Sequence, residues 1–315
     1  MVNPKVYIVV LNYLQWEDSK ECLASVLASD YENYSVLVVD NDSRNQSLEH
    51  LADWLDEYCK NQASSGEHTL FKKEELSQIQ ASQLPKISLI QNDQNDGFAG
   101  GNNVALRILQ AEDAYIWLLN PDMVIEPGTL SALVRFIDQQ EQQCIAGAVV
   151  KSFNGSEQIL FYGGAKVNFN MAPVRLVDQP GDTRSLDFIS GACLFTHARS
   201  FRELGLLPED YFLYWEETDW CYQAKQKGWQ LQVCMPAVCY DKISTVIGRS
   251  YLANYYYARN GLLFISKFRR NKIPVVLFFM GGRWLKRVIT GKWGRARGIY
   301  KGTVDFLKRK RNEAE

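Results

Sequence analysis

The sequence has no long apolar run, few histidines and no closely paired cysteines. No stretch approaches the roughly 20 apolar residues of a membrane-spanning helix, and residues 273–280 form the longest such run near the C-terminus. The three histidines are scattered, and the seven cysteines include no Cys-x-x-Cys pair. These absences argue against a zinc cluster and a disulfide framework, and they favour a reducing cytoplasm. The apolar run at residues 6–11 is too short for a signal peptide and predicts a first strand.

Charge is distributed unevenly along the chain. The net charge is −1, yet residues 259–315 contain 16 Lys and Arg against 3 Asp and Glu, so the remainder is acidic. A basic segment of this kind predicts contact with an anionic surface, either the acidic body of the protein or an anionic membrane. We expect two parts, a domain of residues 1–250 and a helical, basic C-terminal segment of residues 251–315.

Strands and helices alternate through the first 120 residues. Short β-branched runs at residues 7–11, 36–40, 87–90 and 115–119 predict four buried strands, with helical patterns between them. This alternation is typical of a parallel α/β sheet, in which ligands bind beyond the carboxyl ends of the strands. The polar residues that follow the strands therefore predict a binding rim: Asn12, Asp40, Asp42, Asn95 and Asp122.

The remaining stretches are less regular. Residues 56–86 are polar with little periodicity and predict an inserted, partly helical excursion. Residues 152–187 predict loops over the sheet, and residues 188–195 predict a further strand. The polar cluster at residues 40–43 is expected to cap a helix that begins near Gln46.

Residues 211–229 combine aromatic and acidic side chains. Aromatic residues lead directly into Glu216, Glu217 and Asp219, and the helical pattern that follows ends at Gly228. One interpretation is that the three acids only stabilise the N-terminus of a helix. The other is a general base beside an aromatic wall, which excludes water and raises the pKa of the carboxyl toward neutrality.

A glycine-rich loop follows the third predicted strand. Its spacing, Gly97-x-x-Gly100-Gly101, differs from the Gly-x-Gly-x-x-Gly of dinucleotide-binding enzymes and argues against a dehydrogenase. Gly100 and Gly101 either let the backbone approach an anion at a helix N-terminus or serve a turn with tight helix-on-sheet packing.

Asp122 ends the fourth predicted strand, directly after Pro121. Without clustered His or Cys, a metal ion at this position is a hard cation such as Mg²⁺ or Mn²⁺, which takes water and substrate phosphates as further ligands. The alternative is an aspartate that caps a turn.

Six motifs, in order, give the chain a resemblance to a known family. They are VVLNY (9–13), VVDNDS (38–43), NDGFAGGNN (95–103), LLNPD (118–122), SGACL (190–194) and YWEETDWC (214–221). Together they resemble the inverting family 2 glycosyltransferases of the GT-A fold, most closely the bacterial rhamnosyltransferase-like branch. The resemblance covers about residues 5–262. It implies a Rossmann-like, mainly parallel sheet flanked by helices, with a nucleotide-sugar donor lying across the strand ends.

The resemblance also implies roles for individual acids. Asp40 matches the acid that binds the base of the donor, and Asp122 matches the last acid of the metal motif. Glu217 matches the catalytic base, with Glu216 and Asp219 as the alternatives.

Further contacts with substrates follow from the same resemblance. The motif YYARN (256–260) is similar to a closing helix in which Arg259 meets the diphosphate, and Trp215 is a candidate platform for the acceptor, with core packing as its alternative. The expected nucleotide-sugar contacts are Leu11, Asn12, Tyr13, Asp40, Asp42, Asn95, Gly97, Phe98, Gly100, Gly101, Asn102, Asn120 and Arg259.

Two positions depart from the family pattern. The acid pair is usually Glu-Asp but is Glu216-Glu217 here, so the base is one methylene longer. Relatives often carry His-Lys after the last core strand, where the histidine can bind the metal, whereas Asp241 and Lys242 stand there in this chain. Aspartate suits Mg²⁺ or Mn²⁺ at least as well, so Asp241 is the second candidate metal ligand.

These observations predict a metal-dependent inverting glycosyltransferase of cell-surface polysaccharide synthesis. We expect transfer from a nucleotide-diphosphate sugar, with dTDP-rhamnose favoured, to a saccharide or lipid-linked acceptor, and no nucleic-acid partner. The expected location is the cytoplasm, peripheral on the inner face of the cytoplasmic membrane. The alternatives are a sugar nucleotidyltransferase, which needs a second metal-binding acid and releases pyrophosphate, and an inactive nucleotide-sugar-binding module.

Overall fold

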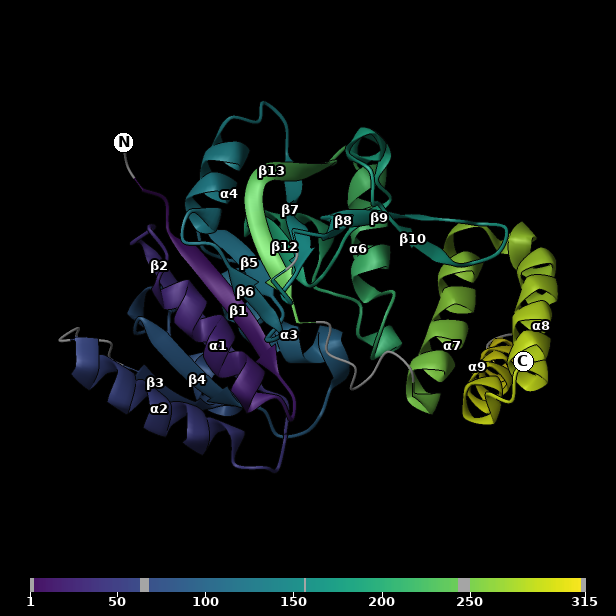
Figure 1. Ribbon diagram of the computed structural model, residues 1–315, viewed down its shortest axis with the longest axis horizontal. Coiled ribbons are helices and arrows are strands. Elements are labelled where there is room, and N and C mark those ends of the chain that lie inside the picture. Colours follow the sequence, from purple (N-terminus) through teal and green to yellow (C-terminus); the bar gives the residue numbers. More distant parts are fainter. Residues whose placement is uncertain (1–2, 63–67, 156, 243–249, 313–315) are drawn as a thin grey trace.

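The computed structural model describes residues 3–62, 68–155, 157–242 and 250–312. Its centre is a 10-stranded sheet with helices on both faces (Figure 1). The strand order is β3-β4-β2-β1-β5-β12-β7-β13-β6, and β8 pairs with β7 off this path. The strands are β1 (Val6–Asn12), β2 (Tyr34–Asp40), β3 (His68–Lys72), β4 (Ile87–Gln91), β5 (Tyr115–Leu119), β6 (Met123–Ile125), β7 (Cys144–Ser152), β8 (Ile159–Tyr162), β12 (Cys193–His197) and β13 (Gln230–Asp241).

The N-terminal half of the sheet is parallel, as predicted. β1 pairs in parallel with β2 and β5, and β4 pairs in parallel with β2 and β3. The carboxyl ends of these strands therefore share one edge of the sheet. β12 is antiparallel to β5 and β7, and β13 is parallel to β7. The mainly parallel sheet confirms the predicted α/β class.

Two apolar cores cover the two faces of the sheet. The helices of the main body are α1 (Trp16–Leu27), α2 (Ser47–Gln62), α3 (Gly97–Leu109), α4 (Thr129–Asp138), α5 (Arg199–Leu204) and α6 (Glu216–Gln226). Side chains alternate between the faces of a strand, so Val6 and Ile8 of β1 pack with α1, α2 and α4. Tyr7 and Val9 point the opposite way and pack with α3 and α6. Because both faces are apolar, polar chemistry is confined to the strand ends.

The irregular stretches agree with expectation only in part: residues 56–86 are partly helical, as predicted, but also contain a strand. Residues 56–86 supply the end of α2, the edge strand β3 and the 3₁₀ helices η1 (Lys73–Gln78) and η2 (Ala81–Gln83), while residues 63–67 lie outside the described ranges. Residues 152–187 contain β8, β9 (Gly164–Val167), β10 (Val174–Leu176) and the 3₁₀ helix η3 (Pro180–Ser185). Residues 188–195 are not one strand. Here β11 (Phe188–Ile189) joins a small sheet of order β10-β9-β11, whereas β12 joins the main sheet.

The C-terminal segment is helical, as predicted. It consists of α7 (Tyr251–Phe268), the short 3₁₀ helix η5 (Arg270–Lys272), α8 (Ile273–Ile289) and α9 (Trp293–Asn312). α9 packs closely on α7 because Gly298 and Gly302 have no side chain; a Cβ atom there would lie 2.5 Å and 2.4 Å from the carbonyl oxygens of Tyr251 and Tyr255. None of the helices in the described ranges has both the length and the apolar character that a membrane crossing requires.

Candidate active site

Asn12 and Asp40, at the ends of β1 and β2, form the centre of a buried hydrogen-bond network. Asn12 Nδ2 donates to Asp40 Oδ1 at 2.6 Å, and Ser43 donates its backbone N–H to Asp40 Oδ2 at 3.0 Å. Gln91 Nε2, at the end of β4, donates to the same Oδ2 at 3.3 Å. These contacts fix the Asp40 carboxylate. α2 begins at Ser47, close to the expected start near Gln46. The Asp40 carboxylate, however, bonds Asn12, Ser43 and Gln91 and does not cap that helix.

A cleft of about 570 Å³ opens beside Asp40. This volume lies in the usual range for small-molecule sites. Charged and amide side chains from the ends of β2, β3 and β4 line it, including Asp42, Arg44, Lys72 and Gln91. Asp42 pairs with Arg44 at 2.8 Å, and both residues have positive φ, which places them on a tight loop at the mouth. The cleft is large enough for a nucleoside and offers it several hydrogen-bonding groups.

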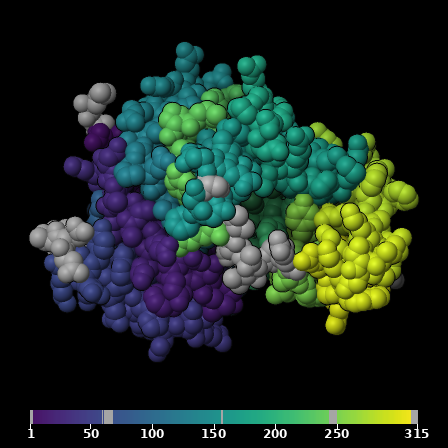
Figure 2. Space-filling view, viewed as in Figure 1, coloured from purple at the N-terminus to yellow at the C-terminus, as the bar shows by residue number. Residues whose placement is uncertain are grey.

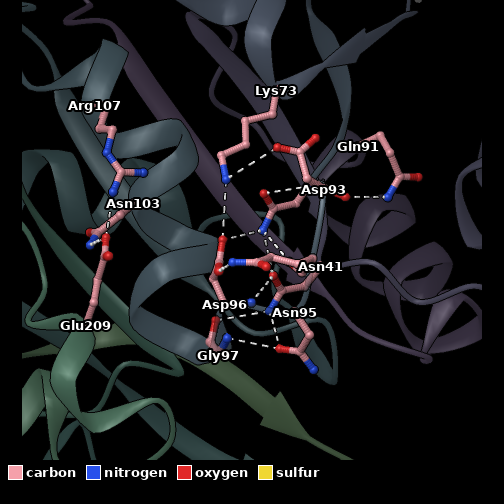
Figure 3. Close-up of polar contacts among 12 residues, drawn as sticks. Asn41, Lys73, Gln91, Asp93, Asn95, Asp96, Gly97, Asn103, Arg107 and Glu209 are labelled. Atoms are coloured by element: carbon pink, nitrogen blue, oxygen red, sulfur yellow. Dashed lines mark hydrogen bonds and ion pairs between the residues drawn. The ribbon is translucent and has the colours of Figure 1, made fainter.

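Asn41 joins the strand ends to α3 and was not among the predicted site residues. Its Nδ2 donates to Asn95 Oδ1 at 2.9 Å and to the Gly97 carbonyl at 3.1 Å. Its Oδ1 accepts from Asn92 Nδ2 at 2.9 Å and from the Asp96 N–H at 3.2 Å. Figure 3 shows Asn41 amid these contacts, with Lys73 reaching Asp96. One sign of this role was present in the sequence: Asn41, an amide residue, directly follows Asp40 at the end of a predicted strand.

The glycine loop serves packing within the protein. Gly97 has φ +71°, and a Cβ atom there would lie 2.0 Å from the Phe212 carbonyl oxygen. A Cβ at Gly100 would lie 2.5 Å from Asp96 Cβ, and one at Gly101 would lie 2.4 Å from Leu11 Cδ1. Protein atoms therefore fill the space beside all three glycines. The side-chain directions of these glycines therefore agree with the tight-packing interpretation.

The segment before α6 has a strained backbone. Phe212, Tyr214 and Trp215 have φ values of 65°, 64° and 81°, a conformation that costs non-glycine residues about 1–3 kcal/mol each. We call residues 212–215 the acid loop. Asn260 of α7, which is fully buried, holds it by donating from Nδ2 to the carbonyls of Tyr211, Leu213 and Tyr214 at 2.7, 2.8 and 3.0 Å. Asn260 was also missed by the sequence analysis.

Glu216 and Glu217 begin α6 directly after the acid loop. Glu216 is 2% exposed, and one buried carboxylate oxygen on each residue has no hydrogen-bond partner. Burial, and then the nearby Glu217, raises the pKa of Glu216 well above its usual value. Burial raises the pKa of Glu217 to about 7, offset in part by backbone N–H groups that include that of Gly191. A carboxylate with this pKa can accept a proton near neutral pH.

Gly191 connects the acids to the strand-end rim. A Cβ atom there would lie 2.9 Å from the Phe98 ring and 3.6 Å from Glu217 Cβ, so only glycine fits between α3 and α6. The next residue, Ala192, accepts the Asn120 N–H at 2.9 Å at the end of β5. Glu217 therefore lies beside the turn between β11 and β12, which is hydrogen-bonded to the residue that follows β5.

Asp219 and Trp215 have structural surroundings. The Asp219 carboxylate is buried and accepts hydrogen bonds from Tyr211 Oη at 2.7 Å, Gln223 Nε2 at 2.6 Å and Lys267 Nζ at 2.8 Å. Lys267 Nζ also donates to Oδ1 at 2.9 Å, so each carboxylate oxygen accepts two hydrogen bonds within the protein, which argues against Asp219 as the base. Trp215 is 2% exposed and packs against Tyr257 and Phe264. It forms part of the core and presents no face to an acceptor.

We predict that Asp219→Ala lowers the free energy of unfolding by about 3 kcal/mol, because it leaves buried donors and Lys267 without their partner. Chemical denaturation measures this change. Glu157→Ala, which removes an exposed partner of Lys151, is the matched control and should change stability little. A large loss of turnover in a fully stable Asp219→Ala protein would contradict the structural role.

Asp122 and Asp241 come together at the ends of β6 and β13. β6 and β13 are antiparallel, with Asp241 opposite Met123, and the Lys242 N–H donates to the Asp122 carbonyl at 3.2 Å. Burial, and then the charge of Asp241, raises the pKa of Asp122 to about 6. Its buried Oδ1 has no hydrogen-bond partner.

These two carboxylates fit a hard divalent cation that completes its coordination with water and phosphate oxygens. The described residues contain no group of three or more His, Cys, Asp or Glu side chains that could hold a metal ion without such outside ligands. Lys242 does not compete for Asp122, because its Nζ pairs with Asp18 at 3.0 Å and Glu21 at 2.5 Å on α1.

The other predicted contacts are dispersed. Tyr13 is 36% exposed just beyond β1, and Asn102 Nδ2 donates to the Phe98 carbonyl at 2.9 Å within α3. The Arg259 guanidinium donates to the carbonyls of Asp210 and Tyr211 at 3.1 Å and 2.8 Å. Arg259 therefore supports the chain that leads into the acid loop, and its contact with a diphosphate stays a prediction.

Comparisons with known proteins agree with this geometry. The family model described as Glycosyl transferase family 2 matches residues 6–205. A relative from Haloferax volcanii, the low-salt glycan biosynthesis hexosyltransferase Agl10, is 26% identical over 161 residues, 47% of this chain and 49% of that protein. The chain thus matches only about half the length of this relative.

Solved structures support the same fold. The mannosyltransferase PcManGT from Pyrobaculum calidifontis, in complex with GDP-Man and Mn²⁺, has a TM-score of 0.60 at 13% identity and covers 98% of this chain and 88% of that one. TarS residues 1–349 from S. aureus, in complex with UDP-GlcNAc, has a TM-score of 0.52 at 18% identity and covers 88% of this chain and 71% of that one. At these identities the likeness shows the fold alone.

Proposed function

Because this chain belongs to glycosyl transferase family 2, we propose that it is an inverting enzyme in which Glu217 activates the acceptor. The observation that carries the proposal is the acid pair at the start of α6, in which Glu216 is buried, Glu217 is half-buried and each has a carboxylate oxygen without a partner. Burial raises the pKa of Glu217 to about 7. Glu217 takes the proton of an acceptor hydroxyl while the hydroxyl oxygen forms a bond to the anomeric carbon. The bond from that carbon to the diphosphate oxygen breaks in the same step, on the opposite side of the sugar, so the configuration inverts.

The donor lies across the strand ends in this proposal. The cleft beside Asp40 takes the nucleoside, and the diphosphate extends toward Asp122, which lies between the end of β5 and the start of β6. Asp122 and Asp241 would hold a divalent cation. When bound, such an ion neutralises the charge that develops on the leaving nucleoside diphosphate. Catalysis then depends on this cation site and on one base that stands across the anomeric carbon from the diphosphate.

We propose dTDP-rhamnose as the donor and a glycan or lipid-linked glycan as the acceptor. UDP- and GDP-sugars are the alternatives, since solved proteins of this fold bind UDP-GlcNAc and GDP-Man. A role in cell-surface polysaccharide synthesis, at the inner face of the cytoplasmic membrane, completes the proposal. It agrees with the glycan biosynthesis named for the Haloferax relative.

A thermal-shift panel tests the donor site. Nucleoside diphosphates and their sugars should raise the melting temperature when Mn²⁺ is present, because a ligand that binds only the folded state stabilises it. We expect dTDP-rhamnose to give the largest shift. Incubation with donor should release a nucleoside diphosphate. Release of pyrophosphate would instead identify a nucleotidyltransferase, binding without any release would indicate an inactive module, and no shift with any nucleotide would refute the donor site.

A further inference from the structure

The outer face of α8 carries an exposed apolar stripe. The inner face of α8 packs through the buried side chains of Val276 and Met280, and Arg283 lies over the ring of Tyr257. The opposite face exposes large side chains at helical spacing: Val275 (41%), Phe278 (78%), Phe279 (37%), Leu285 (50%) and Ile289 (75%). We call these five residues the α8 stripe. Trp293, 67% exposed at the start of α9, continues it.

Basic residues flank the α8 stripe. Between residues 250 and 304 the sequence contains 12 Lys and Arg and no Asp or Glu. Lys286 and Lys292 are exposed, and each lies three residues from Ile289 along the chain. Exposed aromatic and aliphatic side chains on one helix face, bordered by lysines, are the pattern of a helix that lies in a membrane interface.

Some cations of the C-terminal segment contact the acidic body of the protein, and others are left to face a membrane. Lys267 pairs with Asp219 at 2.8 Å, and Arg309 pairs with Asp210 at 3.6 Å, so these cations bind the body of the protein. Lys286 and Lys292, beside the α8 stripe, are exposed. α8 lies at the end of the molecule away from the central sheet (Figure 1), and the space-filling view shows the C-terminal helices, in yellow, forming that end of the surface (Figure 2).

We propose that the α8 stripe binds the interface of an anionic lipid bilayer, with Lys286 and Lys292 at the lipid phosphates. A second copy of the chain is a poorer occupant, because a symmetric contact would bring two basic faces with no intervening acids together. An anionic bilayer matches both the apolar stripe and its charge. Only the purpose of this binding, which is to bring the active site to a lipid-linked acceptor, rests on the proposed function.

Vesicle flotation of the full chain tests this surface. Wild type should float with vesicles of phosphatidylcholine mixed with phosphatidylglycerol, more strongly than with phosphatidylcholine alone, and added salt should weaken the binding. The double variant Phe278→Ser, Ile289→Ser should bind at least about tenfold more weakly, because it removes the two most exposed apolar side chains of the stripe. Lys286→Glu with Lys292→Glu should remove the preference for the anionic vesicles.

Leu176→Ser is the matched control, since Leu176 is 47% exposed on β10, outside the C-terminal helices. It should float like wild type, and all variants should keep the wild-type melting temperature because the replaced side chains are on the surface. Absent flotation, or equal flotation of the Phe278→Ser, Ile289→Ser variant, overturns the proposal. So does a wild-type dimer that this variant converts to monomer without any vesicle binding. No donor is present, so the outcome is independent of the proposed transfer reaction.

Discussion

Replacing Glu217 with Gln should lower turnover by about 10²–10⁴-fold, the usual contribution of a general base. Gln keeps the shape of the side chain but cannot take a proton, so donor binding should be retained. Because the pKa of Glu217 is raised to about 7, wild-type kcat/KM should fall as the pH drops below about 7. Steady-state kinetics across pH, together with calorimetry of donor binding, measure both effects.

Two neighbouring variants serve as controls for this result. Glu217→Asp shortens the side chain by one methylene and should retain part of the activity, because only its reach changes. Glu216→Gln should retain more activity than Glu217→Gln if Glu217 is the base. Near-normal turnover in Glu217→Gln would end the assignment, and a larger loss in Glu216→Gln would transfer the role to Glu216.

The Glu217 carboxyl group also makes the stability of the protein depend on pH. The pKa of Glu217 is about 7 in the folded protein and 4.5 for an ordinary glutamate. The folded state therefore binds this proton more tightly, and the stability it contributes is complete below pH 4.5 and is lost as pH rises through about 7. Glu217→Gln should remove that loss. Melting temperatures at several pH values then separate a carboxyl group with a raised pKa from an ordinary surface acid.

Replacing Asp122 with Asn should abolish the dependence of nucleoside diphosphate binding on a divalent cation. One of two carboxylates would be lost, and we expect the affinity measured with Mn²⁺ to fall by about 10–100-fold. Wild-type affinity should also weaken below pH 6, because the pKa of Asp122 is about 6 and protons compete with the metal. Calorimetry with Mn²⁺ or EDTA detects these effects without requiring turnover.

Asp18→Asn is the matched control for Asp122→Asn. Asp18 lies close enough to raise the pKa of Asp122, yet its carboxylate is occupied by Lys242 at 3.0 Å. Its replacement should leave metal-dependent binding near the wild-type level. Equal affinities for wild type and Asp122→Asn, with and without EDTA, would remove the metal from the proposed mechanism.

The regular part of the fold was predictable because the strands that build it are buried on both faces. Residues 36–40 and 115–119 are apolar at nearly every position, which a parallel sheet requires. β3 was missed because it is an edge strand with mostly exposed side chains, including Leu70 at 59%. Residues 188–195 were read as one strand because the turn at Gly191 interrupts the apolar pattern for only three residues.

The sequence predicted which acids gather at the candidate site, but not which atoms each of them contacts. The acids at strand and helix ends could be found because their positions follow from element boundaries. Asp219 could not be separated from Glu217, because Lys267 lies 48 residues away along the chain. Trp215 and Gly101 looked available for ligands because the sequence does not show which atoms fill the space beside them.

The hydrogen bonds from Asn260 to the acid loop also set the order in which the site is made. During synthesis the ribosome releases the cleft of β2 to β4 first, then the acids of α6, and only later the helix that carries Asn260. Until α7 has folded, the acid loop lacks the three Asn260 hydrogen bonds and keeps only earlier contacts such as that of the Phe98 N–H with the Phe212 carbonyl. The nascent chain therefore completes the cleft beside Asp40 well before the position of Glu217 is fixed.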